Sequence, residues 1–273
     1  MKRDVACLCP ADAHAACRMR CTQRLPVGLP RTCTNSFCAA VSILLDGPSY
    51  HVGVQTALAG NDETTPKNWI RMNLFPATHG PEKEEFMALQ RTELDGYVCV
   101  ADPPASLLVP ELLQLYPNAK VLCTTRDKAK WAVSMEAITK LIIPYPLSRT
   151  LYFWLPTLRL MPILWYLFPK PFIARHGETM TDIESIYRIY DRHHEWLEGV
   201  VLKGKLFYVN VKEGWVPICR ALGVGMPDGL EFPRLNDGKD MEELFRGFAV
   251  EGLRRWGVVV GFVGVVIPGS VGG

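Results

Sequence analysis

The chain has 273 residues, and 48% of them are hydrophobic, enough to bury one substantial core. Its formal net charge of +2 provides no general attraction to nucleic acid or to anionic membranes, so any anion must be bound locally. We therefore expect a single α/β domain with additions at its two ends, and no nucleic-acid partner.

The first 22 residues are interpreted as a disordered extension. Their side chains include four cysteines around one histidine, namely Cys7, Cys9, Cys17, Cys21 and His14. This spacing matches no common structural-zinc pattern, and we expect no metal site there. The same stretch contains no uninterrupted apolar segment of the kind found in signal peptides. Free thiols in a reducing, cytoplasmic compartment are therefore expected.

A turn rich in hydroxyl groups follows a poor first strand at 23–27, in which Pro26 removes a ladder donor. The turn reads GLPRTCTNS over 28–36 and runs into an apolar helix predicted over 35–45. Backbone N–H groups of a first helical turn lack intrahelical partners and lie at the positive end of the helix dipole. With the permanent charge of Arg31 beside them, they predict an anion site.

The turn departs from the GxxxxGK[ST] phosphate loop of ordinary nucleotide triphosphatases. No lysine lies between Arg31 and Asn61, which disfavours a magnesium-dependent triphosphatase. A small-molecule kinase or other phosphotransferase stays open as an alternative. In it, Asp102 at the end of an apolar strand would be a magnesium ligand.

Strands and helices alternate through the middle of the chain. Strands are predicted at 97–101, 120–125 and 205–211, and helices at 105–115 and 127–140. This order implies a parallel sheet with ligands at the carboxyl ends of its strands.

Three other segments do not follow this alternation. The polar stretch 61–83, with three prolines, is predicted as loop and short helix. The apolar, aromatic segment 141–173 is interpreted as a lid or acceptor-pocket insertion, and packing without ligand contact is the alternative. A C-terminal helix and apolar tail are expected over 241–273. As a helix, the uncharged residues 257–273 reach about 25 Å, less than the ~30 Å of bilayer hydrocarbon, so a tail anchor in an internal membrane is not favoured.

Arg126 closes the strand at 120–125, and Ser134 lies about two helical turns further on, so both can face one ligand. An arginine and a serine in this arrangement look like the nucleotide 3′-phosphate site of sulfotransferases. Together with the GLPRTCTNS loop, they make the chain resemble the P-loop sulfotransferase superfamily. The resemblance is closest to its fungal branch, whose loop reads GxPRTGT.

Further blocks in the same order extend the resemblance over roughly residues 26 to 240. These blocks are 95–116, 206–214, 214–223 and 232–236. The resemblance implies a P-loop NTPase-like fold with three α/β/α layers around a central parallel sheet. Residues 23–240 would form this domain.

The resemblance also implies the chemistry. The sulfuryl group of 3′-phosphoadenosine 5′-phosphosulfate would pass, without a metal ion, to a hydroxyl or amine of a small lipophilic molecule. Arg31 would act catalytically by stabilising charge on the leaving phosphate. The implied nucleotide-binding residues are Gly28, Arg31, Thr32, Cys33, Thr34, Asn35, Ser36, Arg126, Ser134, Tyr208 and Arg234. Cys33 stands where the family most often has glycine. A side chain there is tolerable only where the backbone does not need positive φ, or it can narrow the cofactor channel.

A general base must also take the acceptor's proton. Cytosolic sulfotransferases use a histidine in an HLP sequence, and the corresponding triplet here is Asp-Pro-Pro, beginning at Asp102. A partly buried carboxylate can serve as a base, so Asp102 is our candidate, with a helix-capping role as the alternative. His51 and His79 are weaker alternatives, because the sequence places neither at a strand end. A catalytically silent nucleotide-binding homologue also stays open, given Cys33, the poor first strand and the missing histidine.

Overall fold

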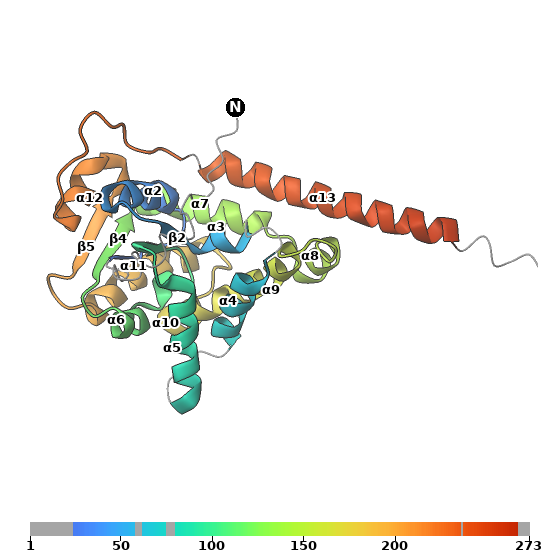
Figure 1. Cartoon of the computed structure of the whole chain (residues 1–273), viewed down its shortest axis with the longest axis horizontal. Helices are drawn as coiled ribbons and strands as arrows, with labels where there is room; N and C mark the ends of the chain where they lie inside the picture. The colour runs from blue at the N-terminus through green and yellow to red at the C-terminus, as the bar shows by residue number, and fades with distance from the viewer. Residues whose placement is uncertain (1–23, 58–61, 75–79, 236, 267–273) are drawn as a thin grey trace, which may run out of the picture.

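The computed structural model describes residues 24–57, 62–74, 80–235 and 237–266 (Figure 1). Within these residues, the sheet has five strands in the order β2-β3-β1-β4-β5, and every neighbouring pair is parallel. The strands are β1 (Arg24–Pro26), β2 (Ser49–His51), β3 (Cys99–Ala101), β4 (Lys120–Thr125) and β5 (Leu206–Asn210). The predicted α/β class with parallel strands is confirmed. Most of the chain in Figure 1 is helical.

Helices pack on both faces of the sheet. On one face, α2 (Thr34–Leu45) and α12 (Trp215–Leu222) share an apolar cluster with β4, in which Phe37, Ile218 and Leu122 are buried. The fold thereby buries the first helix after the loop directly against the sheet.

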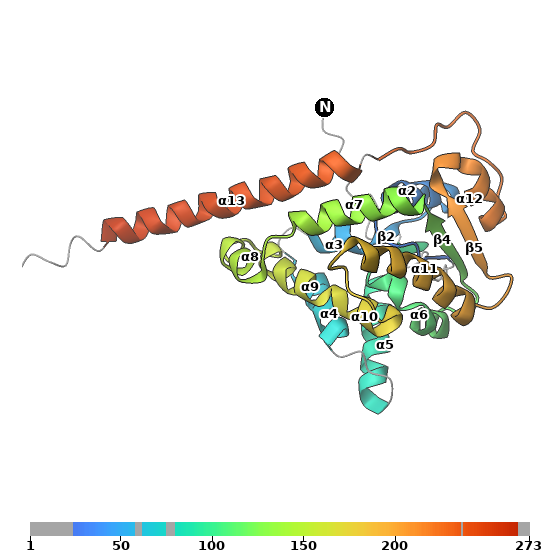
Figure 2. The same ribbon diagram turned by 180° about the vertical axis from the view of Figure 1, so that it is seen from behind.

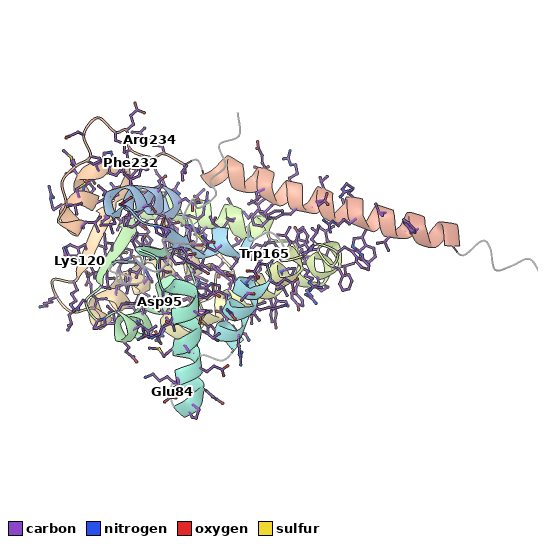
Figure 3. The ribbon with its side chains drawn as sticks, viewed as in Figure 1. Glu84, Asp95, Lys120, Trp165, Phe232 and Arg234 are labelled. Carbon is purple, nitrogen blue, oxygen red and sulfur yellow. The ribbon has the colours of Figure 1, made fainter. Side chains whose placement is uncertain are left out.

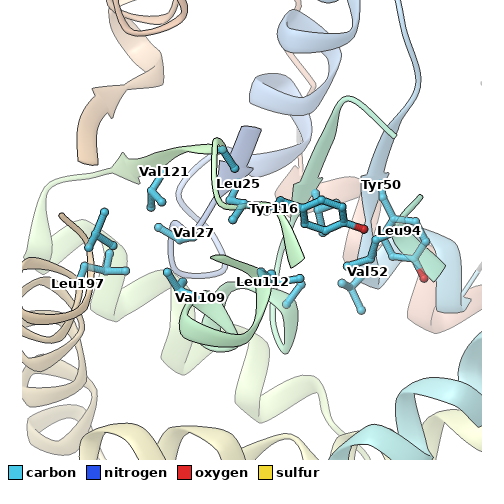
Figure 4. Close-up of a cluster of buried hydrophobic side chains, with 14 of the residues drawn as sticks. Leu25, Val27, Tyr50, Val52, Leu94, Val109, Leu112, Tyr116, Val121 and Leu197 are labelled. Carbon is cyan, nitrogen blue, oxygen red and sulfur yellow. The ribbon is translucent and has the colours of Figure 1, made fainter. Parts of the chain in front are cut away.

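The opposite face is covered by α5 (Gly80–Leu94), α6 (Val109–Leu115) and α11 (Ile183–Val200). Figure 4 shows this second cluster, in which Val121 of β4 lies among side chains from these helices. Because successive strand residues point to opposite faces, Val121 joins this cluster and its neighbour Leu122 joins the other.

The strand that leads into the loop, β1, lies in the middle of the sheet although it contains Pro26. The N–H of Val27 donates to the carbonyl of Leu122 at 2.9 Å, so Pro26, one residue earlier, turns its backbone toward β3. β1 has three register pairs with β4 but only Arg24↔Cys99 with β3. The missing N–H of proline explains the shorter ladder to β3.

The prediction of loop and short helix over 61–83 is wrong in most of its length. Helix α4 spans Thr64–Leu74, and α5 begins at Gly80. Pro66 and Pro81 lie in the first turns of these helices, where a missing N–H costs nothing because it would have no intrahelical partner. The prolines therefore mark helix starts.

The remaining helices lie around the carboxyl edge of the sheet and beyond it. They are α3 (Val52–Ala57), α7 (Lys128–Leu141), α8 (Tyr145–Leu151), α9 (Met161–Leu167), α10 (Pro169–His176) and α13 (Asp237–Val266), with short 3₁₀ turns at Ala105–Leu107, Leu158–Leu160 and Val211–Glu213. The segment expected as a lid thus forms α8, α9 and α10. Figures 1 and 2 show α13 running past α8 and projecting beyond the rest of the fold.

Two predictions concern the ends of the chain, the N-terminal extension and the apolar tail. The extension over residues 1–22 and the last seven residues of the apolar tail lie outside the described residues. In the ranges that the structure describes, no helix combines the length and apolar character of a bilayer span.

Two buried histidines lie behind the strand that leads into the loop. Nε2 of His193 is 2.7 Å from the carbonyl oxygen of Val27, and its Nδ1 is 3.3 Å from Nε2 of His176. Because a carbonyl oxygen only accepts, His193 donates from Nε2 and accepts a hydrogen bond from His176. Burial lowers the pKa of His193 to about 3 and that of His176 to about 4, so both rings are neutral near pH 7.

We expect the free energy of unfolding to fall as the pH drops from about 6.5 toward 4. In this window unfolded histidines bind protons while the buried pair does not, because the folded pKa values are about 3 and about 4. Each histidine then removes up to ~1.4 kcal/mol per pH unit. Urea unfolding at a series of pH values measures the slope, and His193→Gln should flatten it. An unchanged slope in that variant would contradict this account.

Candidate active site

The loop between β1 and α2 has an unusual backbone. Arg31 and Cys33, on either side of Thr32, have φ of 69° and 66°. Left-handed values cost ordinary residues ~1–2 kcal/mol and concentrate at functional sites. The hydroxyl of Thr32 donates to the carbonyl of Leu29 at 2.6 Å and lies 2.6 Å from Oγ1 of Thr124. The side chain of Thr32 therefore fastens the loop to β4, and its predicted ligand role rests on its backbone amide.

Gly28 is required by packing at the start of this loop. A Cβ at this position would lie 1.8 Å from Oγ1 of Thr124 and 2.9 Å from the backbone nitrogen of the same residue. The loop thus crosses β4 at a distance that admits only glycine. Gly28 shapes the site, whether or not it contacts a ligand.

From the sequence, a side chain at position 33 was expected to be tolerable only where the backbone does not need positive φ. The backbone of Cys33 does have positive φ, so this condition is not met. We expect Cys33→Gly to raise the free energy of unfolding by ~1 kcal/mol and the Tm by ~2 °C, because glycine adopts this φ without strain. Thermal unfolding followed by circular dichroism measures the gain. Cys33→Ala is the matched control, because it removes the thiol and keeps Cβ. Equal gains in both variants would assign the effect to the thiol and contradict the prediction.

Three predicted nucleotide-binding residues from separate elements meet at the loop. Nε of Arg31 donates to Oγ of Ser134 at 3.2 Å, and Nη1 of Arg126 donates to the carbonyl of Arg31 at 3.0 Å. Arg126 follows β4, and Ser134 lies on α7. Nε of Arg126 is buried with no hydrogen-bond partner among the described residues. Since buried donors are nearly always satisfied, a bound anion fits this position.

Helix α7 holds the loop from one side. Its N-terminus is capped by Asp127, whose Oδ1 accepts from the N–H of Lys130 at 2.9 Å. One turn later the indole N–H of Trp131 donates to the carbonyl of Pro30 at 2.7 Å. The cap and the indole contact place Ser134 within hydrogen-bond distance of Arg31.

A cavity of about 470 Å³ opens beside Arg31. Most of its wall is apolar, and α3, α7, α9 and α13 all contribute to it, for example with Val54, Met135, Trp165 and Phe248. Figure 3 labels Trp165, and its ring centroid lies 5.4 Å from that of Phe245 on α13. A volume of this order suits a small-molecule site. The sequence did not predict the contribution of α13, because nothing in the pattern of its residues indicates that it packs near the loop.

His51 and Asp102 lie together at the polar end of this cavity. His51 ends β2 and pairs in register with Ala101, the last residue of β3, a strand-end position that the sequence alone did not fix. Its Nδ1 is 3.8 Å from Oδ2 of Asp102, and its Nε2 is 3.0 Å from Oγ1 of Thr34. Asp102 has φ 79°, a third left-handed residue at this site. The weaker alternative, His79, lies outside the described residues.

Gly53 provides the room for this pair. A Cβ built on it would lie 3.0 Å from Oδ2 of Asp102 and 3.6 Å from Nδ1 of His51. Even an alanine at this position would press on the carboxylate of Asp102 while only touching His51. The first residues of α3 are therefore part of the site, although the sequence alone did not single them out.

The start of α2 contains two further predicted residues. Asn35 lines the cavity. Oγ of Ser36 accepts from the N–H of Leu235 at 3.0 Å, which brings the loop containing Arg234 next to the N-terminus of α2. Arg234 is exposed there, and Figure 3 labels it on this loop. The ligand contacts of these residues stay predictions.

Tyr208 lies farther back on β5. Its ring stacks on that of His194 with centroids 5.6 Å apart, and its hydroxyl donates to Glu198 at 3.1 Å. Burial and this hydrogen bond raise the pKa of Tyr208, so the hydroxyl stays protonated. The side chain is 43% exposed, and its predicted contact with an adenine is untested.

The part of the chain that the structure describes contains no group of three histidine, cysteine, aspartate or glutamate side chains able to hold a metal ion.

The model of a family described as a sulfotransferase domain matches residues 25–241. The chain is also similar to the Ava biosynthesis cluster protein M of Aspergillus versicolor, with 28% identity over 153 residues. That match covers 52% of this chain and 55% of the relative, so it spans about half the length of each protein.

Proposed function

Because the chain belongs to the sulfotransferase-domain family, we propose that it moves a sulfuryl group from 3′-phosphoadenosine 5′-phosphosulfate to a small lipophilic alcohol, phenol or amine. One observation carries the proposal. Arg31, Arg126 and Ser134 converge on a single loop, next to an apolar cavity with a polar end. A P-loop NTPase-like arrangement, with helices in layers on both faces of the parallel sheet, belongs to the same proposal.

The two anionic ends of the nucleotide would be held by different residues. Arg126 and Ser134 would bind the 3′-phosphate, and the unpartnered Nε of Arg126 supports this assignment. Arg31 and the amides at the start of α2 would bind the 5′ end. Arg31 lines the cavity and Arg126 does not. The 5′ end of the nucleotide, which carries the sulfuryl group, would therefore face the acceptor in the cavity.

The chain's own residues would then perform two tasks. Arg31, permanently protonated, would neutralise charge that develops on the leaving phosphate. His51 would take the acceptor's proton on Nε2, where the hydroxyl of Thr34 now lies 3.0 Å away. Asp102, 3.8 Å from Nδ1, would orient the ring and stabilise its protonated form. In the alternative assignment, Asp102 itself is the base.

The cavity supports the acceptor class. Its wall is mainly aliphatic and aromatic, and its polar side chains include Thr34, Asn35, His51 and Asp102. A single hydroxyl or amine on an otherwise apolar molecule suits such a site. The Aspergillus versicolor relative is named for a biosynthesis cluster, which agrees with a small-molecule acceptor.

Calorimetry tests the nucleotide. We expect tight binding of 3′,5′-adenosine bisphosphate that does not depend on Mg²⁺, and weak binding of ATP. If the protein instead binds ATP tightly, and only with Mg²⁺, the kinase assignment would be supported and the sulfotransferase assignment rejected. Sulfate transfer from labelled nucleotide to acceptors in a crude extract then distinguishes an active enzyme from a silent nucleotide-binding protein.

A further inference from the structure

Helix α13 exposes apolar side chains on more than one side. Its face toward α8 is packed, since a Cβ on Gly252 would lie 2.6 Å from the carbonyl of Leu151. Its outer face nevertheless exposes Val250 and Leu253, at 60% and 64%. An amphipathic surface helix would place polar residues there.

The projecting end of α13 is apolar around its whole circumference. No charged residue occurs over 257–266, and Val258, Val259 and Val260 follow one another. At about 100° per residue, consecutive positions point to three different sides of a helix. Phe262 is 74% exposed near the tip. A protein groove takes one face of a helix, whereas lipid hydrocarbon can surround all of it.

Aromatic and cationic side chains lie where this end leaves the fold. Trp256 and Trp154 contact each other with centroids 5.9 Å apart, and the indole N–H of Trp256 donates to the carbonyl of Thr150. Arg254 and Arg255 share the single carboxylate of Glu251, which leaves one positive charge. Tryptophan beside arginine is the pattern of a membrane–water interface.

The neighbouring segment adds to this surface. Residues 141–168 contain two arginines and no acidic residue. On α8 and just after it, Leu147 is 60% exposed and Phe153 is 49% exposed. Arg159 is ion-paired with Glu63, so the positive charge of this segment at the surface comes from Arg149. Exposed apolar side chains beside a positive charge complement an anionic lipid surface.

We infer that α13 and α8 dock on an anionic lipid bilayer. The docking surface comprises Leu147, Phe153, Trp154, Val250, Leu253, Val258, Val260 and Phe262, with Arg149, Arg254 and Arg255 beside it. Residues 257–266 span about 15 Å as a helix, the depth of one leaflet's hydrocarbon. The helix therefore enters one leaflet while Trp154 and Trp256 lie at the headgroups.

The docked helix also connects to the cavity. Leu244, Phe245 and Phe248, on the first half of α13, line the cavity wall. In this respect the inference rests on the proposed function: the acceptor is an alcohol or phenol dissolved in the lipid, and it reaches the site along α13.

Flotation with lipid vesicles tests the docking on the full chain. The wild type should float with vesicles of phosphatidylcholine mixed with phosphatidylserine, and less with phosphatidylcholine alone. Phe262→Asp should lower partitioning by about ten- to a hundredfold. The matched control is Leu202→Asp, since Leu202 is 71% exposed after α11, outside the docking surface. It should float like the wild type.

Three outcomes would overturn the inference: no flotation of the wild type, equal losses in both variants, or light scattering that shows a dimer broken by Phe262→Asp. Calorimetry with 3′,5′-adenosine bisphosphate, without vesicles, should be unchanged in Phe262→Asp. If the wild type floats but does not bind the bisphosphate, the proposed function fails while the docking stands. If the wild type binds the bisphosphate but does not float, the docking inference fails while the proposed function stands.

Discussion

Replacing His51 with glutamine is expected to lower kcat by ~10² to 10⁴, because no group at Nε2 would then take the acceptor's proton. The nucleotide should bind nearly as in the wild type, since His51 contacts the hydroxyl of Thr34 and the carboxylate of Asp102, whereas the cations and the amides at the start of α2 would hold the phosphates. Initial rates at saturating nucleotide measure kcat, and calorimetry with the bisphosphate measures affinity. A kcat equal to that of the wild type would remove His51 from this role.

Asp102→Asn separates the two assignments of the base. It keeps the size of the side chain opposite Nδ1 of His51 and removes the charge. If Asp102 only orients the ring, Asp102→Asn should lower kcat less than His51→Gln does. If Asp102 is itself the base, Asp102→Asn should show the larger loss, again ~10² to 10⁴ with little change in nucleotide affinity. Unchanged turnover in Asp102→Asn would exclude it as the base.

Arg126→Ala is expected to weaken binding of the bisphosphate about ten- to more than a hundredfold, which corresponds to ~1.5–3 kcal/mol for a charged hydrogen bond. Calorimetry of the variant against the wild type measures the change. The affinity of Arg126→Lys for the bisphosphate should lie between those of the wild type and Arg126→Ala, because lysine keeps the charge but cannot reproduce the planar guanidinium.

Adenosine 5′-monophosphate provides the control ligand for Arg126. It lacks the 3′-phosphate, so Arg126→Ala should change its weaker binding little. Equal losses with both compounds would contradict a 3′-phosphate contact. The effect of Arg126 would then come from its hydrogen bond to the carbonyl of Arg31, which supports the loop.

The elements around the proposed nucleotide site were largely predictable from local sequence. The run KVLCTT became β4 with the predicted bounds, and helix α7 begins one residue after the capping Asp127. Strand, cap and helix are all local signals, so Arg126 and Ser134 could be placed without knowledge of the rest of the chain. Their approach to Arg31 followed from the rule that parallel strands share a carboxyl edge.

The acceptor side was less predictable because it depends on contacts between distant segments. Strand β2 has three residues, too few for any periodicity, and only its register with β3 brings His51 to Asp102. The three prolines of 61–83 favour loop on sequence grounds, whereas Pro66 and Pro81 occupy the first turns of α4 and α5. The left-handed backbone of Cys33 was also hidden, since composition says nothing of φ at a single residue.

Helix α7 is a wall common to both halves of the site. Trp131 and Ser134 contact the loop, and Met135 and Ile138, on the following turns, line the cavity. On the proposed function, a change of side-chain volume on this helix would disturb the nucleotide and the acceptor together. Residues of α9 and α13 such as Leu164 and Phe248 line the cavity without touching the loop's hydrogen bonds. Evolution, or an engineer, can therefore broaden the range of acceptors from those two helices at the least expense to nucleotide affinity.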